Sequence, residues 1–153
     1  MIKKQITAQA AAELINCGDT VTIAGFVGVG VPDEILLALE NRFKERCKPA
    51  DLTLLFAAAP GDGKDRGLNR LAHAGMLRRT IGGHYGLAPK LGKLATSGEI
   101  QAYNFPQGVI SHMYRDIAAG KPGTLTRVGI DTFVDPRIEG GKINKQTTED
   151  LVE

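Results

Sequence analysis

One stretch, residues 20–34, constrains the fold more than any other part of the chain. It begins with four consecutive β-branched residues, 20–23, which favour a β-strand. Three glycines follow, and they free the φ angles of a tight turn: Gly25, Gly28 and Gly30. Pro32 suits the first position of a helix, where a missing N–H costs nothing. The stretch therefore predicts a strand, a glycine-rich turn and the start of a helix.

The turn in this stretch predicts a ligand site. Its backbone N–H groups would be free at the carboxyl end of a strand, where open α/β sheets bind ligands. The spacing excludes a dinucleotide fingerprint, because Asp33 stands where G-x-G-x-x-G would need its third glycine. No Lys-Ser or Lys-Thr follows, which excludes a Walker A loop. A turn that only needs tight packing remains the alternative.

The rest of the chain repeats this pattern. Strands are predicted at 20–23, 52–56, 76–81 and 100–105, and helices at 7–16, 32–46, 68–75, 87–95 and 109–119. Short strands are expected between 124 and 133, and loops after them. Alternating strands and helices predict an α/β fold with an open, mainly parallel sheet, helices on both faces and all post-strand loops at one edge.

Composition narrows the class of protein. The chain of 153 residues is 42% hydrophobic, enough for one domain with a core. A net charge of +2 gives no case for nucleic acid, and no apolar run suits a membrane span or signal peptide. Cys17 and Cys47 are far from any histidine, so we expect reduced thiols, no metal and a cytoplasmic protein.

Two motifs resemble a known family. Ala24-Gly25-Phe26 followed by Gly-x-Gly-x-Pro-Asp-Glu34, with Phe105-Pro106-Gln107-Gly108 further on, is similar to the first half of the family I coenzyme A transferases. The likeness is strongest to the acetate, propionate and 3-oxoacid branch. It implies a CoA-transferase/NagB-like fold, with residues 1–141 as the N-terminal, alpha-like domain. Residues 142–153 would be a tail or the start of a linker to a C-terminal (beta) half.

The resemblance also implies a reaction. Family members exchange coenzyme A between an acyl-CoA and a small carboxylate, through a glutamyl–CoA thioester. Coenzyme A is a substrate, and no cofactor is bound permanently. The family nucleophile lies in a Glu-x-Gly turn of the second half, whereas here Glu40-Asn41 is followed by Arg42 inside a predicted helix. We therefore expect the nucleophile outside this chain, a chain inactive alone, and an oligomer in ketone-body or short-chain fatty acid metabolism.

The site residues follow from the resemblance. Gln107 would donate its amide to the acyl or oxyanion site, although a helix-capping role is the alternative. The expected substrate-binding residues are Gly25, Phe26, Val27, Gly28, Val29, Gly30, Pro106 and Gly108. Weaker candidates are His84, in a post-strand loop, and Lys64. We expect the glycine turn and Gln107 to meet at one acyl carbonyl.

Two other functions remain open from the residues alone. The chain could be a stand-alone phosphate- or nucleotide-binding α/β domain that uses the Gly25–Gly30 turn. It could also be a non-enzymatic assembly module that pairs through an open edge of its sheet. Nucleotide binding by the isolated chain would favour the first, and burial of the sheet edge by a partner would favour the second.

Overall fold

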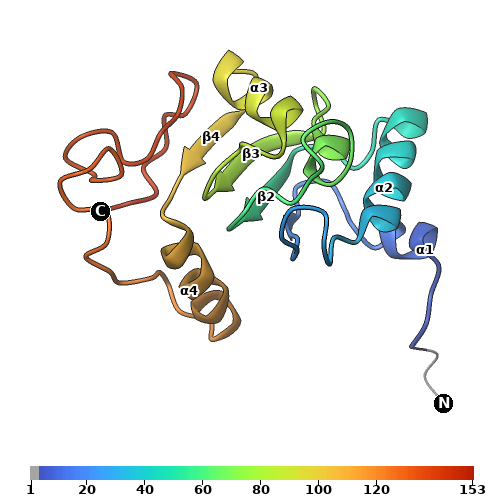
Figure 1. The fold of residues 1–153 in the computed structure, drawn as a ribbon, viewed down its shortest axis with the longest axis horizontal. Coiled ribbons are helices and arrows are strands. Elements are labelled where there is room, and N and C mark those ends of the chain that lie inside the picture. Colours follow the sequence, from blue (N-terminus) through green and yellow to red (C-terminus); the bar gives the residue numbers. More distant parts are fainter. Residues whose placement is uncertain (1–3) are drawn as a thin grey trace.

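The computed structural model describes residues 4–153 and contains a four-stranded parallel sheet flanked by helices (Figure 1). The strands are β1 (Thr20–Thr22), β2 (Leu52–Phe56), β3 (Leu77–Gly82) and β4 (Gln101–Asn104). They lie in the order β1-β2-β3-β4, and all three pairings are parallel. The predicted fold class is confirmed, and all post-strand loops lie at one edge.

The helices are α1 (Ala8–Glu13), α2 (Asp33–Arg46), the 3-10 helix η1 (Leu68–Leu71), α3 (Pro89–Ser97) and α4 (Gln107–Ala118). Their ends have local causes. The Thr7 hydroxyl accepts a hydrogen bond from the Ala10 N–H at 3.1 Å and caps α1. Gly98 ends α3 in the left-handed conformation, which glycine adopts without strain. Both signals were readable in the sequence.

One face of the sheet carries the larger core. Side chains from α1, α2, η1 and α3 pack there against Leu52, Leu54 and Phe56 of β2. Every residue of β2 is buried, as expected for a strand covered on both faces. Leu39 of α2 and Leu91 of α3 are fully buried in this aliphatic layer. The layer fixes β2 and the loop that follows it.

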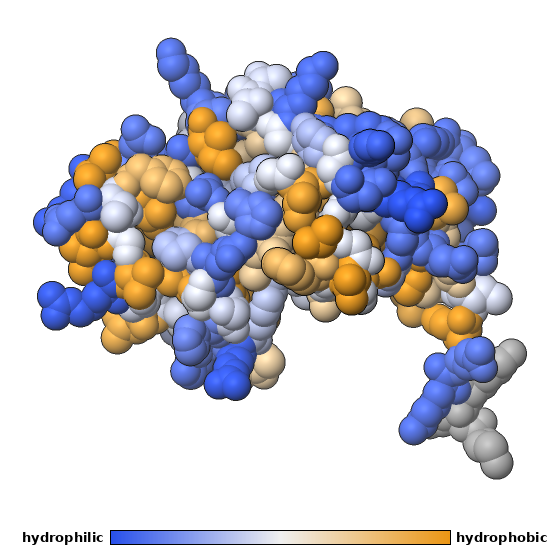
Figure 2. Space-filling model, viewed as in Figure 1, coloured by the Kyte–Doolittle hydropathy of each residue, from blue (hydrophilic) through white to orange (hydrophobic). Residues whose placement is uncertain are grey.

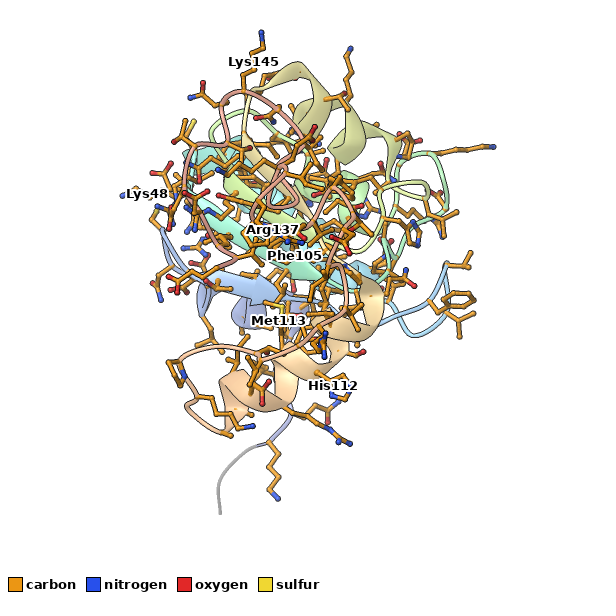
Figure 3. The ribbon with its side chains drawn as sticks, turned by 90° about the vertical axis from the view of Figure 1, so that its left-hand side faces the viewer. Lys48, Phe105, His112, Met113, Arg137 and Lys145 are labelled. Atoms are coloured by element: carbon orange, nitrogen blue, oxygen red, sulfur yellow. The ribbon has the colours of Figure 1, made fainter. Side chains whose placement is uncertain are left out.

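The opposite face is covered by α4 and by the residues after it. Leu55, Tyr103, Phe105, Ile110 and Val134 form a separate buried cluster there. Met113 of α4 packs against this cluster, whereas its neighbour His112 is exposed and points away (Figure 3). Helices therefore lie on both faces of the sheet.

Residues 119–153, which we call the C-terminal segment, contain no helix or strand. The prediction of short strands between 124 and 133 is therefore wrong. Gly129 (φ 101°) and Asp131 (φ 62°) turn the backbone instead, and the N–H of Thr132 donates to the carbonyl of Gly129. These turns interrupt an alternation of apolar residues that otherwise resembles a strand.

The C-terminal segment covers the outer edge of β4. The Asn104 N–H donates to Gly141 O at 2.8 Å, and the Ile143 N–H donates to Ala102 O at 2.9 Å. The buried Thr147 hydroxyl accepts from the Ala102 N–H at 2.8 Å. Residues 142–153 thus lie against the sheet, and the domain boundary at 141 stays a prediction.

Candidate functional site

The carboxyl edge of the sheet brings four loops together. The glycine turn follows β1, residues 57–67 follow β2, residues 83–88 follow β3, and α4 begins just after β4. This is the edge at which open α/β sheets bind ligands. The candidate site is therefore built from backbone at four strand ends.

The glycine turn is a closed and strained hairpin. The Phe26 N–H donates to Val29 O at 3.0 Å, and the Val29 N–H donates back to Phe26 O at 2.9 Å. Val27 between them has a φ of 55°, which a β-branched residue rarely adopts. Such strain persists only where surrounding contacts fix the backbone, and it is common at functional sites.

The second loop supplies one of those contacts. The Gly61 N–H donates to Val27 O at 2.8 Å, and Pro60 packs against Gly25. The expectation that every N–H of the turn is free needs correction, because Phe26 and Val29 use theirs internally. Among residues 4–153, no group accepts from the N–H of Val27, Gly28 or Gly30. These three groups are the donors that a ligand could use.

An ion pair ties the second loop to α2. Arg70 of η1 holds Asp33 with two parallel hydrogen bonds, Nε to Oδ1 and Nη2 to Oδ2, both at 2.9 Å. The Gly67 N–H also donates to Asp33 Oδ1 at 2.9 Å. The hydrogen bond from Arg70, more than any other contact, lowers the pKa of Asp33 below its ordinary value. Asp33 thus fixes the loop that supports the turn.

Glu40 extends the same network away from the edge. Burial alone would raise the pKa of Glu40, but hydrogen bonds from Lys44, His73 and Arg70 outweigh it and lower the pKa. Its Oε1 lies 2.7 Å from Lys44 Nζ and 3.0 Å from His73 Nε2. A carboxylate held by three donors on a helix has a structural role, and the predicted exclusion of Glu40 as the nucleophile fits this setting.

Gln107 is the first residue of α4 and is exposed. Its Cγ lies so close to Gly83 that a Cβ at position 83 would overlap both this atom and the Ala57 carbonyl oxygen. Position 83 therefore requires glycine, and the close approach gathers the ends of β2, β3 and β4. Pro106 precedes α4 without any side-chain cap, and the Gln107 amide makes no hydrogen bond within residues 4–153. The capping alternative thus finds no support.

The glycine turn and Gln107 are linked through residues 57–61. The turn packs on Pro60 and Gly61, whereas Gln107 packs beside Gly83 and Ala57. β1 and β4 are the outer strands of the sheet, so three strand spacings, about 14 Å, separate their axes. Gln107 leans back toward β2 across part of that distance. Their meeting at one acyl carbonyl stays a prediction.

The other sequence candidates lie around this edge. His84 lines a cavity of about 470 Å³ together with Tyr85, Asn104 and Lys142, and Pro106 lines a different cavity of about 290 Å³ beside α4. Lys64 and Gly108 are exposed. The Lys64 N–H donates to Asp62 Oδ1 at 2.9 Å in a surface turn. The structure thus scatters the weaker candidates.

Sequence reasoning missed Asn104, the last residue of β4. Its Nδ2 donates to Gly82 O at 2.9 Å and to Gly83 O at 2.7 Å, which fixes the loop after β3. An asparagine at a strand end next to Pro and Gln was the available signal. Among the described residues, no group of His, Cys, Asp or Glu side chains could hold a metal ion. None of the helices described is long and apolar enough to span a bilayer.

Comparison with known proteins adds an independent line. Residues 4–151 match the family described as Coenzyme A transferase. The chain is 45% identical over 150 residues to the caffeate CoA-transferase of Acetobacterium woodii, which covers 98% of this chain and 29% of that protein. It is 33% identical over 136 residues to the alpha subunit of the acetate CoA-transferase of Escherichia coli (strain K12), covering 88% of this chain and 58% of that relative.

The fold matches a solved acyl-CoA transferase. The structure of YdiF from E. coli O157:H7, a thioester complex with CoA, gives a TM-score of 0.93 at 37% identity. The match covers 97% of this chain and 29% of that one. The chain thus spans less than a third of the length of the longer relatives that it matches.

Proposed function

Because the chain belongs to the coenzyme A transferase family, we propose that it is the first part of an enzyme that exchanges coenzyme A between a short-chain acyl-CoA and a carboxylate. The observation that carries the proposal is the agreement of 97% of the chain, at a TM-score of 0.93, with an acyl-CoA transferase solved as a CoA thioester. The setting would be cytoplasmic short-chain acid metabolism.

The reaction needs a carboxylate nucleophile from outside this chain. A glutamate oxygen attacks the thioester carbonyl and the CoA thiolate leaves, which gives a mixed anhydride. The thiolate then attacks the glutamyl carbonyl and releases the first carboxylate, leaving CoA on the glutamate. A second carboxylate reverses both steps. The engagement of Glu40 with three donors supports a nucleophile located elsewhere.

This chain would supply donors for the oxyanion of each tetrahedral intermediate. The Gln107 amide is exposed at the edge and makes no hydrogen bond within residues 4–153. The N–H groups of Val27, Gly28 and Gly30 are held in place by the strained turn. Donors that are fixed before the reaction stabilise developing charge without reorganisation. Gly25, Phe26, Val29, Pro106 and Gly108 would line the substrate path.

The second half would come from the rest of the enzyme. Two relatives are named as single subunits of a transferase: the E. coli alpha subunit, already described, and part of the probable succinyl-CoA:3-ketoacid coenzyme A transferase of Bacillus subtilis. The A. woodii relative is one longer chain. Both arrangements would place the nucleophile beyond the part matched here, so the isolated chain would not turn over.

A chimera tests the proposal. Residues 4–151 replace the matching part of E. coli YdiF, and transfer from acetyl-CoA to propionate or caffeate is measured. We expect transfer, and borohydride should reduce a glutamyl thioester outside residues 4–151. Gln107→Ala should lower kcat about 100-fold, the usual loss for one oxyanion donor, with little change in KM. His112→Ala, exposed on the same helix, is the matched control.

Two results would contradict the proposal. One is a borohydride label on a glutamate of residues 4–151. The other is a folded Gln107→Ala chimera that retains full activity, which would remove Gln107 from the acyl site.

A further inference from the structure

The C-terminal segment exposes large apolar side chains beside α4. Ile117 of α4 is 59% exposed, Leu125 is 102%, Val128 is 61% and Ile130 is 47%. We call these four residues the segment patch. Leu125, Val128 and Ile130 line one groove of about 890 Å³, while Ile117 and Val128 line the adjoining cavity of about 290 Å³. Apolar residues gather over this part of the molecule, at the left of Figure 2.

Polar contacts hold the backbone of the segment while the patch faces outward. The buried Asp135 carboxylate accepts from the Arg137 N–H and Nε, both at 2.9 Å, and from the Asp131 N–H at 2.8 Å. Asp116 of α4 accepts from Lys121 Nζ and from the Thr124 hydroxyl, both at 2.7 Å. The segment thus keeps its path without burying the patch, whereas isolated soluble domains seldom expose linked apolar surface.

The relatives indicate what covers the patch. The same path is kept in YdiF, because 97% of this chain superposes on it with a TM-score of 0.93, although the match accounts for only 29% of that chain. The E. coli alpha subunit is itself matched over only 58% of its length. A first half therefore contains more polypeptide than the part seen here. Leu151 and Val152 line the groove that Leu125 and Val128 line.

We propose that the segment patch is the docking face for this additional polypeptide of the first half, through aliphatic side chains that fill the groove. The inference rests on the proposed function for the identity of the occupant. It separates the two contacts of the chain: the patch binds the remainder of its own half, and the carboxyl edge of the sheet faces the half that carries the nucleophile.

Hydrogen exchange in the isolated chain and in the YdiF chimera tests the inference. The amides of residues 125–130 should exchange at least tenfold more slowly in the chimera. Leu125→Asp and Ile130→Asp should leave the melting temperature of the isolated chain unchanged. Each should weaken the chimera about tenfold or more in its folding equilibrium, since burial of one such side chain has that worth. Leu125→Met and Arg127→Glu, which keep the apolar area, are the controls.

The outcomes separate this inference from the proposed function. Equal exchange of residues 125–130 in both proteins would overturn the inference, even in an active chimera. A protected patch in an inactive chimera would support it and count against the transferase proposal. Concentration-dependent dimers of the isolated chain, abolished by Leu125→Asp, would show that a second copy occupies the patch and would overturn the inference.

Discussion

The sheet and its helices, residues 8–118, differ from the C-terminal segment in how they are held. In the sheet region, aliphatic side chains such as Leu39, Leu54 and Leu91 are fully buried. In the segment, Leu125 is fully exposed, and polar tethers fix the backbone. Arg79, for example, bonds both Gln101 and Glu149, and the Tyr103 hydroxyl donates to Glu149 O at 2.8 Å.

The difference teaches which part carries its own stability. Apolar burial stabilises the sheet region at any pH and salt concentration. A segment held by hydrogen bonds and ion pairs gains less from each contact, and it depends on the surface against which it lies. The segment should therefore open before the sheet unfolds. Four substitutions test this contrast, beginning with the largest effect.

Leu54→Ala should be the most damaging change, because it leaves a cavity in the centre of β2. We expect a loss of about 3 kcal/mol in the free energy of unfolding, measured by urea titration. Leu37→Ala, at a position 40% exposed on α2, should cost well under half as much. Equal losses would show that the sheet region is not held by its core.

Asn144→Ala should release the segment. Its Nδ2 donates to Ala95 O and to Ile100 O, and its Oδ1 accepts from the N–H and hydroxyl of Thr147. We expect a loss of about 2 kcal/mol, with faster hydrogen exchange at 141–149 and unchanged exchange in β2. Lys145→Ala, whose side chain points outward (Figure 3), is the control. Faster exchange in β2 would contradict separate opening.

Asp33→Asn tests the main polar tether inside the sheet region. The folded pKa of Asp33 is lowered, so its ion pair stabilises the protein above the unfolded pKa, and this contribution is lost as the pH falls through the lower folded value. We expect the variant to lose about 1 kcal/mol at pH 7. The difference from the parent should shrink below about pH 4. A constant difference in urea titrations at pH 7 and pH 3 would argue against the ion pair.

Leu125→Ser should have the smallest effect on the isolated chain. The side chain is fully exposed, so the free energy of unfolding should change by less than about 0.5 kcal/mol. Thermal unfolding at two protein concentrations checks this. A clear loss would mean that Leu125 is already buried in solution by another molecule.

Much of the sheet was predictable because its signals are local. The apolar run 52–56 gave the bounds of β2, and Thr7 and Gly98 marked helix ends that the structure confirms. The family resemblance, built on the motifs around Gly25 and Gln107, is confirmed by the match over residues 4–151. These features need only neighbours in sequence.

The failures came where distant contacts decide the backbone. The helix expected over 68–75 is the short η1, because the buried Asn69 side chain bonds Arg66 O, Leu87 O and the Lys90 N–H instead of continuing a helix. At the site, the pairing of Asp33 with Arg70 joins residues 37 positions apart. No local pattern signals such a contact, so the sequence could place the glycines but not the groups that hold them.

The tight fit at Gly83 has a consequence for how this protein can vary. Every substitution there introduces a Cβ that would strike the backbone of Ala57, which cannot retreat as a flexible side chain can. In a saturation library selected for function, position 83 should tolerate no alternative, while the neighbouring position 84 should accept several. A lineage could alter the amide at 107 in one step, but could never reach a new chemistry there by first changing the glycine beneath it.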